Sequence, residues 1–332
     1  DTSFQAAHGG RGGAPSGTAR PLSTTSRQDQ TTKSYAAYTT MEYDLTDRVA
    51  LEGGLRYTYD HKQFKLLLTQ RTGTVATNQN DTDHWDDWSP MAGIRFQATD
   101  DLMFYRKWSR GFRSGQFNGR GNGLNALTTN SVEPETVKVS EVGMKSSWLD
   151  NRVIFNIAAF RTNFTDQQIT TFTSDGVRFV SLVQNAGKSR IIGAEMDLAL
   201  RATNDLSFFG SLGALNAKYL TFREPVAGNL TAPPVDVSSR DFKNTPELSF
   251  NVGAEYTLPV PVLWGLLGAR VDYSHKSQVY YNTANTESIR QDKVGLLNGR
   301  LVWTSNDDTV EIALWGRNLT NRKWDAFGLD LN

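Results

Sequence analysis

The sequence predicts an all-β protein: a transmembrane antiparallel β-barrel, of which this chain provides about twelve strands. Three observations lead to this prediction. Segments of about ten residues alternate apolar and polar residues, the connections between them alternate between short and long, and the polar side of the segments carries many charges. Together these features are typical of barrels that cross an outer membrane with strands.

The alternation is clearest in residues 248–256. Leu248, Phe250, Val252, Ala254 and Tyr256 occupy every second position, and polar residues or glycine lie between them. Successive side chains of a strand point to opposite faces, so this segment has one apolar face and one polar face. In a soluble sandwich the apolar face fills a core, whereas in a membrane barrel it contacts lipid and the polar face lines a lumen.

The same pattern recurs along the chain and predicts twelve strands arranged as hairpins. Their approximate cores are residues 34–43, 49–59, 88–97, 102–112, 137–146, 152–164, 191–201, 206–217, 248–257, 266–275, 294–303 and 309–319.

The connections between these strands fall into two length classes. The short ones are rich in Asp, Asn and Ser, which favour tight turns because their side chains bond the local backbone. They are residues 44–48, 97–101, 148–151, 202–205 and 304–308, with a longer Pro-rich variant at 258–265. The long, polar ones are about 60–87, 113–136, 165–190, 218–247 and 276–293. All long loops fall at one end of the strands, which we expect to be extracellular.

Alternation also assigns each strand a lipid face and a lumen face. The expected lipid-facing residues include Val49, Leu51, Leu55 and Tyr57; Ala194, Met196, Leu198 and Leu200; Leu267, Ala269, Val271 and Tyr273; and Val310, Ile312 and Leu314. The expected lumen-facing charges are Glu52, Arg56, Arg95, Glu141, Lys145, Glu195, Asp197, Glu255, Arg270, Asp272, Arg300, Glu311 and Arg317. A dry core does not accommodate so many charges, because an unpaired buried ion costs several kcal/mol.

Composition excludes several other classes of protein. The chain has 332 residues and no cysteine, so it has no disulfide, thiol nucleophile or cysteine-based zinc site. Its 35 basic and 35 acidic residues give a net charge of zero, so nothing indicates a nucleic-acid partner. No apolar run approaches the ~18 residues that a transmembrane helix needs. The mean hydropathy of −0.46 is compatible with a barrel, which interleaves its apolar residues with polar ones.

Several segments resemble the barrel of TonB-dependent outer-membrane receptors. They occur in order from about Tyr35 to the end of the chain, with matching loop spacing, at residues 93–102, 109–119, 133–136, 141–145, 185–195 and 314–320. The resemblance implies a 22-stranded barrel with an N-terminal plug domain. It also implies TonB-energised uptake of a scarce nutrient, most often a ferric siderophore, in the outer membrane of a Gram-negative bacterium.

The sequence departs from that family at both ends. Residues 1–32 form a polar stretch that we interpret as a loop, without a signal peptide, a plug domain or a TonB box. Residues 325–332 lack a closing strand that ends in an aromatic residue. We therefore expect residues 1–332 to form an open barrel segment, with the plug and the final strands absent. The alternative is a passive, porin-like channel of about twelve strands.

The segment around Phe112 holds the candidate ligand residues. Arg113, Gln116 and Asn118 could face a ligand vestibule and bind an anionic siderophore. In the alternative interpretation, the neighbouring glycines supply loop bends and Arg113 pairs with a nearby residue or with lipopolysaccharide. Loop residues are often functional, although single ones are hard to identify.

Other chemistry has little support in the sequence. The acidic run 81–87, which contains His84, could bind calcium, but it lacks the glycine and the terminal glutamate of a dedicated calcium loop. The four histidines accompany no G-x-S-x-G nucleophile motif. We therefore predict no enzyme activity, no catalytic or metal residue and no cofactor. The expected partners are outer-membrane lipid and lipopolysaccharide, a siderophore-like ligand, and TonB through the plug, with the protein a monomer.

Arg106 does not fit the alternation. Leu102, Phe104 and Trp108 place it on the lipid face, whereas Lys107 faces the lumen. Either the guanidinium extends toward the nearer headgroup layer, or a bulge turns Arg106 inward toward a carboxylate such as Glu141. We favour the first alternative.

Overall fold

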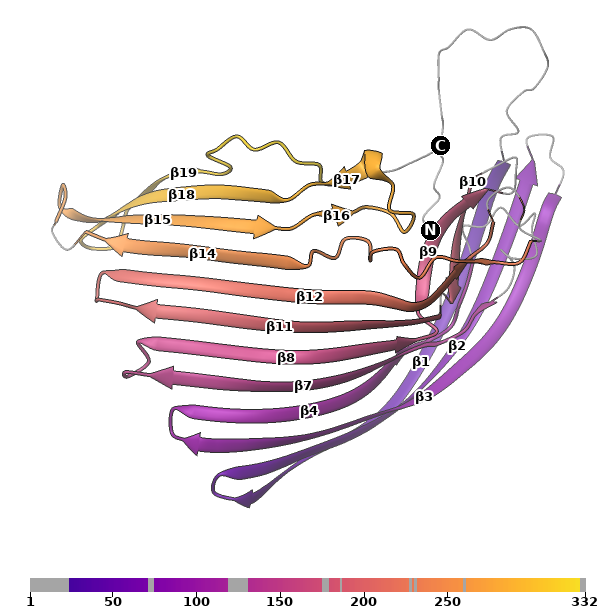
Figure 1. Ribbon diagram of the computed structural model, residues 1–332, viewed down its shortest axis with the longest axis horizontal. Helices are drawn as coiled ribbons and strands as arrows, with labels where there is room; N and C mark the ends of the chain where they lie inside the picture. Colours follow the sequence, from indigo (N-terminus) through magenta and orange to yellow (C-terminus); the bar gives the residue numbers. More distant parts are fainter. Residues whose placement is uncertain are drawn as a thin grey trace, which may run out of the picture.

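The protein is described by a computed structural model for residues 24–70, 75–118, 131–174, 179–185, 187–226, 229, 232–258 and 261–328. Twelve strands lie side by side in one curved antiparallel sheet (Figure 1). They are β1 (Thr24–Thr46), β2 (Val49–Gln70), β3 (Val75–Thr99), β4 (Leu102–Arg113), β7 (Glu135–Trp148), β8 (Val153–Thr165), β11 (Gly187–Arg201), β12 (Leu206–Glu224), β14 (Leu248–Thr257), β15 (Gly265–Lys276), β18 (Val294–Ser305) and β19 (Glu311–Gly316).

The predicted all-β fold and all twelve predicted strands are confirmed. Each strand pairs with the next one of the twelve along the chain, so the sheet is a continuous meander. The short turns lie at the left in Figure 1 and the longer connections at the right. Within the described residues β1 pairs with β2 and β19 with β18, so this sheet is an open barrel segment and not a closed small barrel.

The predicted long loops contain more strand than the sequence indicated. β2 continues to Gln70 and β3 begins at Val75, so the predicted loop 60–87 is mostly a long hairpin. β1 begins at Thr24, which places residues 24–32 of the predicted polar loop in a strand. The sequence did not predict this hairpin because residues 75–87 are mostly polar. They form a strand by pairing with β2, which contributes apolar residues. Residues 1–23 and 119–130 lie outside the described part.

The other loops contain short elements. These are β5 (Gln116–Phe117) with β6 (Ser131–Val132), β9 (Gln168–Ser174) with β10 (Phe179–Asn185), β13 (Val235–Asp236) beside β12, and β16 (Val279–Tyr280) with β17 (Arg290–Gln291), which follows the 3-10 turn η1 (Glu287–Ile289). No helix in the described ranges is long and apolar enough to span a membrane.

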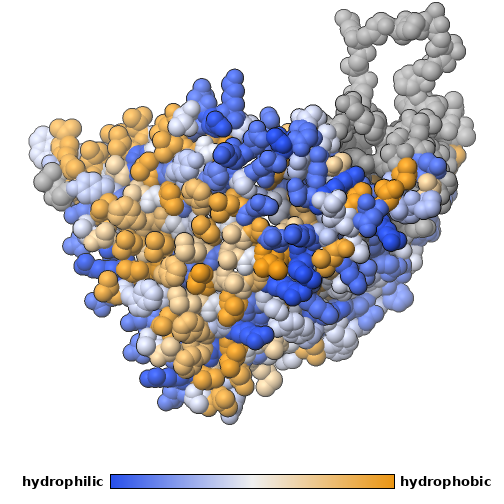
Figure 2. Space-filling view, in the orientation of Figure 1, coloured by the Kyte–Doolittle hydropathy of each residue, from blue (hydrophilic) through white to orange (hydrophobic). Residues whose placement is uncertain are grey.

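The register confirms the two predicted faces. Directly opposed residues share a face, and one row runs Leu51, Ile94, Arg106, Val142, Ala159 and Ala194. On this outer face Ile94 is 44% and Val142 54% exposed. Hydrophobic residues cover much of the strand region in Figure 2. On the inner face Arg95 pairs with Glu42, and Arg300 with Glu311 at 2.6 Å.

Arg106 lies on the outer face, directly opposite Ile94 and Val142. The register of β4 with β7 has no shift, so the alternative of a bulge that turns Arg106 inward is wrong. Glu141, the proposed inward partner, instead accepts a hydrogen bond from the hydroxyl of Tyr105 at 2.7 Å. The chain therefore keeps a cation on its apolar face.

Glycine is needed where an aromatic ring of a neighbouring strand covers the backbone. At Gly253 an added Cβ would lie 2.8 Å from Cε2 of Phe209 and 2.8 Å from the carbonyl oxygen of Val271. The ring of Phe209 is fixed from above by Arg270, whose guanidinium carbon lies 4.3 Å from the ring centroid. At Gly53, in contrast, nothing lies within 4 Å of the added atom.

We predict that Gly253→Ala destabilises the complete barrel by about 1–3 kcal/mol, the usual cost of overpacking. The backbone carbonyl of Val271 cannot move aside without disturbing the sheet. Urea unfolding in detergent micelles, followed by tryptophan fluorescence, measures the change. Gly53→Ala is the matched control, and an equal loss in both variants would contradict the prediction.

We also predict that Arg106→Leu stabilises the barrel, by up to about 2–4 kcal/mol if the side chain lies near the bilayer midplane. Removing an arginine from lipid contact removes its desolvation cost. The same unfolding measurement in lipid vesicles tests this. Lys107→Leu, on the inner face of the same strand, is the control and should not raise the stability. Unchanged or lower stability of Arg106→Leu would contradict the prediction.

Candidate ligand vestibule

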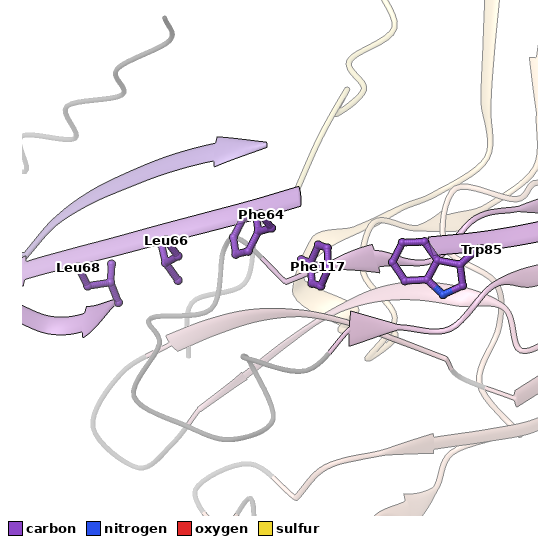
Figure 3. Close-up of a cluster of buried hydrophobic side chains, with 5 residues drawn as sticks. All are labelled: Phe64, Leu66, Leu68, Trp85 and Phe117. Atoms are coloured by element: carbon purple, nitrogen blue, oxygen red, sulfur yellow. The ribbon is translucent and has the colours of Figure 1, made fainter. Parts of the chain in front are cut away.

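The loop end of the inner face is covered by loops that fold back onto the sheet. Phe64, Leu66 and Leu68 project from the same side of β2, and Trp85 comes from β3 (Figure 3). Phe117 of β5 packs against them, with its ring stacked 5.5 Å from that of Phe64. The connection between β4 and β7 is thus anchored to the inner face of the β2–β3 hairpin.

Lys62 lies beside this cluster, on the extension of β2 beyond residue 59. Its ammonium group donates a hydrogen bond to the carbonyl oxygen of Gly115 at 2.6 Å and lies 5.5 Å from the ring of Trp85. Burial lowers the pKa of Lys62, and nearby Arg113 adds to this shift while Asp60 opposes it. Lys62 is therefore a partly buried cation with both a carboxylate and a guanidinium in its surroundings.

Gln116 holds two loops together. Its amide nitrogen donates to Oε1 of Gln168 in β9 at 2.9 Å. Gln168 in turn donates to the carbonyl oxygens of Ser114 at 3.0 Å and Glu133 at 2.9 Å. The backbone N–H of Gln168 donates to the Glu135 carboxylate at 2.6 Å. Gln168 is therefore the centre of this network.

Asn118 is buried and binds the backbone of β10. It donates to the carbonyl oxygen of Val183 at 2.9 Å and accepts from the N–H of Val183 at 2.8 Å. Asn185 makes a similar link, because its amide donates to the carbonyl oxygens of Glu133 and Asp166 and accepts from the N–H of Glu133. Two segments that the sequence resemblance singled out are thus bonded to each other.

A second cluster lies farther along the sheet. Ile169 of β9, Tyr219 and Phe222 of β12, and Val237 are buried together. Phe242 stacks on Tyr219 with ring centroids 4.1 Å apart. Burial, with a smaller contribution from Glu224, raises the pKa of Tyr219 to about 12.

A pocket of about 230 Å³ adjoins the second cluster on the inner face. Its lining combines apolar, hydroxyl, amide and carboxylate side chains: Leu215, Ala217, Asp241, Phe242, Thr245, Glu247, Ser277, Gln278, Val279 and Tyr280. Such mixed lining is typical of small-molecule sites, where a few polar groups fix the orientation of a ligand.

The three predicted ligand residues have different surroundings. Arg113 is exposed, lies on the inner face and is directly opposite Glu135. The amides of Gln116 and Asn118 are engaged in bonds between loops. Sequence reasoning missed Lys62, Gln168 and Asn185. Asn185 stood within a segment that resembled the family, which was the only signal for it.

No group of three or more His, Cys, Asp or Glu side chains in the described ranges could hold a metal ion. In the acidic run 81–87, Asp87 forms a two-pronged ion pair with Arg110, at 2.6 and 2.7 Å. That carboxylate is therefore already neutralised.

Residues 2–319 match the sequence model of a family described as TonB dependent receptor-like, beta-barrel. A relative from Acinetobacter baumannii, the probable TonB-dependent siderophore receptor PiuA, is 23% identical over 264 residues, which cover 79% of this chain and 33% of PiuA. The pesticin receptor of Yersinia pestis is 23% identical over 306 residues, 90% of this chain and 40% of that protein. The chain therefore spans less than half the length of these relatives.

Solved structures show the same fold. The ferric yersiniabactin uptake receptor FyuA from Yersinia pestis superposes with a TM-score of 0.75 at 20% identity, covering 93% of this chain and 44% of FyuA. The structure of the siderophore receptor PiuA gives a TM-score of 0.71 at 21% identity, covering 90% of this chain and 40% of PiuA.

We predict that Asn118→Ala loosens the contact between the two loops. The N–H of Val183 loses its acceptor, so its hydrogen exchange should speed up by roughly tenfold, as expected for one lost hydrogen bond. Hydrogen-exchange mass spectrometry of the peptide that contains Val183 measures this. Asn80→Ala, at an exposed position of β3, is the control; equal exchange in both variants would show that the link contributes nothing.

Proposed function

Because the chain belongs to the TonB-dependent receptor β-barrel family, we propose that it forms part of an outer-membrane receptor for TonB-energised uptake of a ferric siderophore. The family match over residues 2–319 carries this proposal. The names of the relatives PiuA and FyuA support siderophore as the cargo class. The long-loop end of the sheet would face the outside of the cell.

The loop arrangement supports a receptor over a passive channel. A porin-like channel keeps a water-filled lumen. Here the connections after β4 and β8 are joined by Gln116, Gln168 and Asn118. The connection after β12 packs against β9 through Val237 and Ile169, so the described parts of three connections form an inner layer. A layer of this kind gives a ligand a shaped surface at the mouth of the lumen.

Within this vestibule we assign ligand contact to Arg113. Its guanidinium is exposed on the inner face and would attract an anionic ferric complex. Gln116 and Asn118 would position the loop that follows Arg113 instead of contacting the ligand. The pocket beside Phe242 would accommodate part of a larger ligand.

The remaining partners follow from the same proposal. Energy would reach the barrel from TonB through a plug domain, as the resemblance implies. Members of the family are transport receptors, so we assign this chain transport and no catalytic reaction. We further propose that the receptor acts as a monomer.

We predict that Arg113→Gln in the complete receptor raises the half-saturating concentration of an anionic ferric siderophore by roughly tenfold, the effect of losing one charged hydrogen bond. Uptake of iron-55 is measured in cells that lack their own receptors, with a panel of catecholate, hydroxamate and phenolate siderophores. Arg106→Gln, on the outer face of the same strand, should leave uptake unchanged.

Two outcomes would contradict the proposal. Equal half-saturation for both variants removes Arg113 from the ligand site but leaves the receptor function intact. Uptake that does not depend on TonB, together with permeation of unrelated small sugars, would establish the passive channel.

A further inference from the structure

Two of the chain's four histidines meet on the outer face of the sheet. His61 of β2 and His84 of β3 are directly opposite each other in the long hairpin. His61 lies an even number of residues from Leu51, and His84 an even number from Ile94, so both histidines are on the outer face with these residues. His84 is exposed and His61 is half-buried. The two imidazoles therefore project from neighbouring strands on the same side of the sheet.

The hydrogen-bonding pattern of the hairpin brings these two side chains close together. Opposed residues of an antiparallel pair alternate between hydrogen-bonded and non-hydrogen-bonded positions, and side chains are closer at the latter. The N–H of Gln97 donates to the carbonyl oxygen of Arg48 at 2.8 Å, which marks that pair as hydrogen-bonded. The register has no shift from there to the histidines, and His61 is an odd number of steps from Arg48. The histidines thus form a non-hydrogen-bonded pair, with Cβ atoms about 4.5–5.5 Å apart.

The histidine pair lies just beyond the apolar layer of the membrane. Counted from the short turn, residues 49–59 of β2 provide the ~9–11 residues that a transmembrane strand needs. The rings of Tyr57 and Trp88, 4.9 Å apart, mark the aromatic boundary of that layer on the outer face. His61 and His84 follow on the loop side of these rings, so water and dissolved ions reach them.

The contacts of the pair leave its imidazole nitrogens available. The ring of Tyr59 lies 5.8 Å from that of His84, and the backbone N–H of His84 donates to the Asp83 carboxylate at 2.8 Å. Neither contact uses a nitrogen of the imidazole. The nearest cation on the same face is Lys33 of β1, which is exposed and directly opposite His61.

We propose that His61 and His84 together bind a divalent transition-metal ion that prefers imidazole ligands, of which Cu²⁺ and Zn²⁺ are examples. Two imidazoles at opposed positions chelate one ion, whereas Ca²⁺ and Mg²⁺ prefer oxygen ligands. In the described part of the chain no third His, Cys, Asp or Glu side chain completes the set, so water fills the remaining positions. The site lies outside the lumen, so it does not rest on the siderophore proposal.

The bound ion links β2 to β3 outside the membrane. Its two ligands come from different strands, so it binds the paired hairpin and not the separated strands, and this preference stabilises the hairpin. The inner face of the same hairpin carries Phe64 and Leu66, against which Phe117 of the following connection packs. The ion therefore strengthens the support on which that connection rests.

Metal titration of the complete receptor tests the site. The protein, produced without a histidine tag and held in detergent micelles, is titrated with Cu²⁺, Zn²⁺ and Ca²⁺ in a calorimeter. We expect Cu²⁺ to bind more tightly than Zn²⁺, and Ca²⁺ not to bind at this site. His61→Gln and His84→Gln should each weaken Cu²⁺ binding at least about tenfold, because one of two linked ligands is lost.

His275→Gln is the matched control. His275 also lies on the outer face, in β15, but it is opposite Phe250 and Gly295 and therefore has no second imidazole beside it. This variant should bind Cu²⁺ within about twofold of the wild type. Equal affinity in all three histidine variants, or an equal loss in all three, would overturn the proposal.

Lys33→Gln provides a variant in which binding should improve. Removing a positive charge opposite His61 lowers the repulsion of the ion, so we expect Cu²⁺ to bind about threefold more tightly. A gain of this kind does not arise from misfolding. Unchanged or weaker binding in Lys33→Gln would place the ion elsewhere and overturn the site.

Hydrogen exchange tests the link between the strands. Zn²⁺ at ten times its dissociation constant should slow exchange in the peptide that spans residues 60–68 by up to about tenfold in the wild type. His84→Gln should show no such slowing. Metal binding that leaves this exchange unchanged in the wild type would show that the ion does not join β2 to β3.

Discussion

Backbone hydrogen bonding between neighbouring strands is the constraint on which the rest of this structure depends. Inside a bilayer no water is available to pair an exposed N–H or C=O, so each strand must find its partners in the next strand. The meander from β1 to β19 meets this need along its length, with one partner on each side of every interior strand. Because pairing fixes the register, it also fixes which side chains meet lipid and which meet the lumen.

This dependence explains what could be predicted from the sequence. Strand positions follow a period of two, and Leu248 to Tyr256 shows that period without reference to any distant residue. The loop structure has no such local signal. Residues 75–87 are polar and became strand only through their pairing with β2, where Phe64 and Leu66 are buried under Phe117. That contact joins residues far apart in the sequence, which periodicity does not detect.

The residues of the candidate site also differ in whether strand periodicity alone could predict their position. Arg113 could be placed on the inner face by counting from Trp108, and the register agrees. The roles of Gln116 and Asn118 could not be read from the sequence, because their partners Gln168 and Val183 lie on a different loop. A polar residue that the sequence suggests as a ligand contact can therefore hold the loops of the vestibule together instead.

The links between the loops affect how proteases and antibodies can recognise this part of the protein. Asn118, Asn185 and Gln168 tie the connections together through side chains that bind backbone groups. Proteases need an extended, unpaired stretch of chain in their clefts, and antibodies raised against free peptides recognise flexible ones. Within the described residues the linked segments β5, β9 and β10 offer neither, so a molecule that recognises them must bind several loops in their folded arrangement.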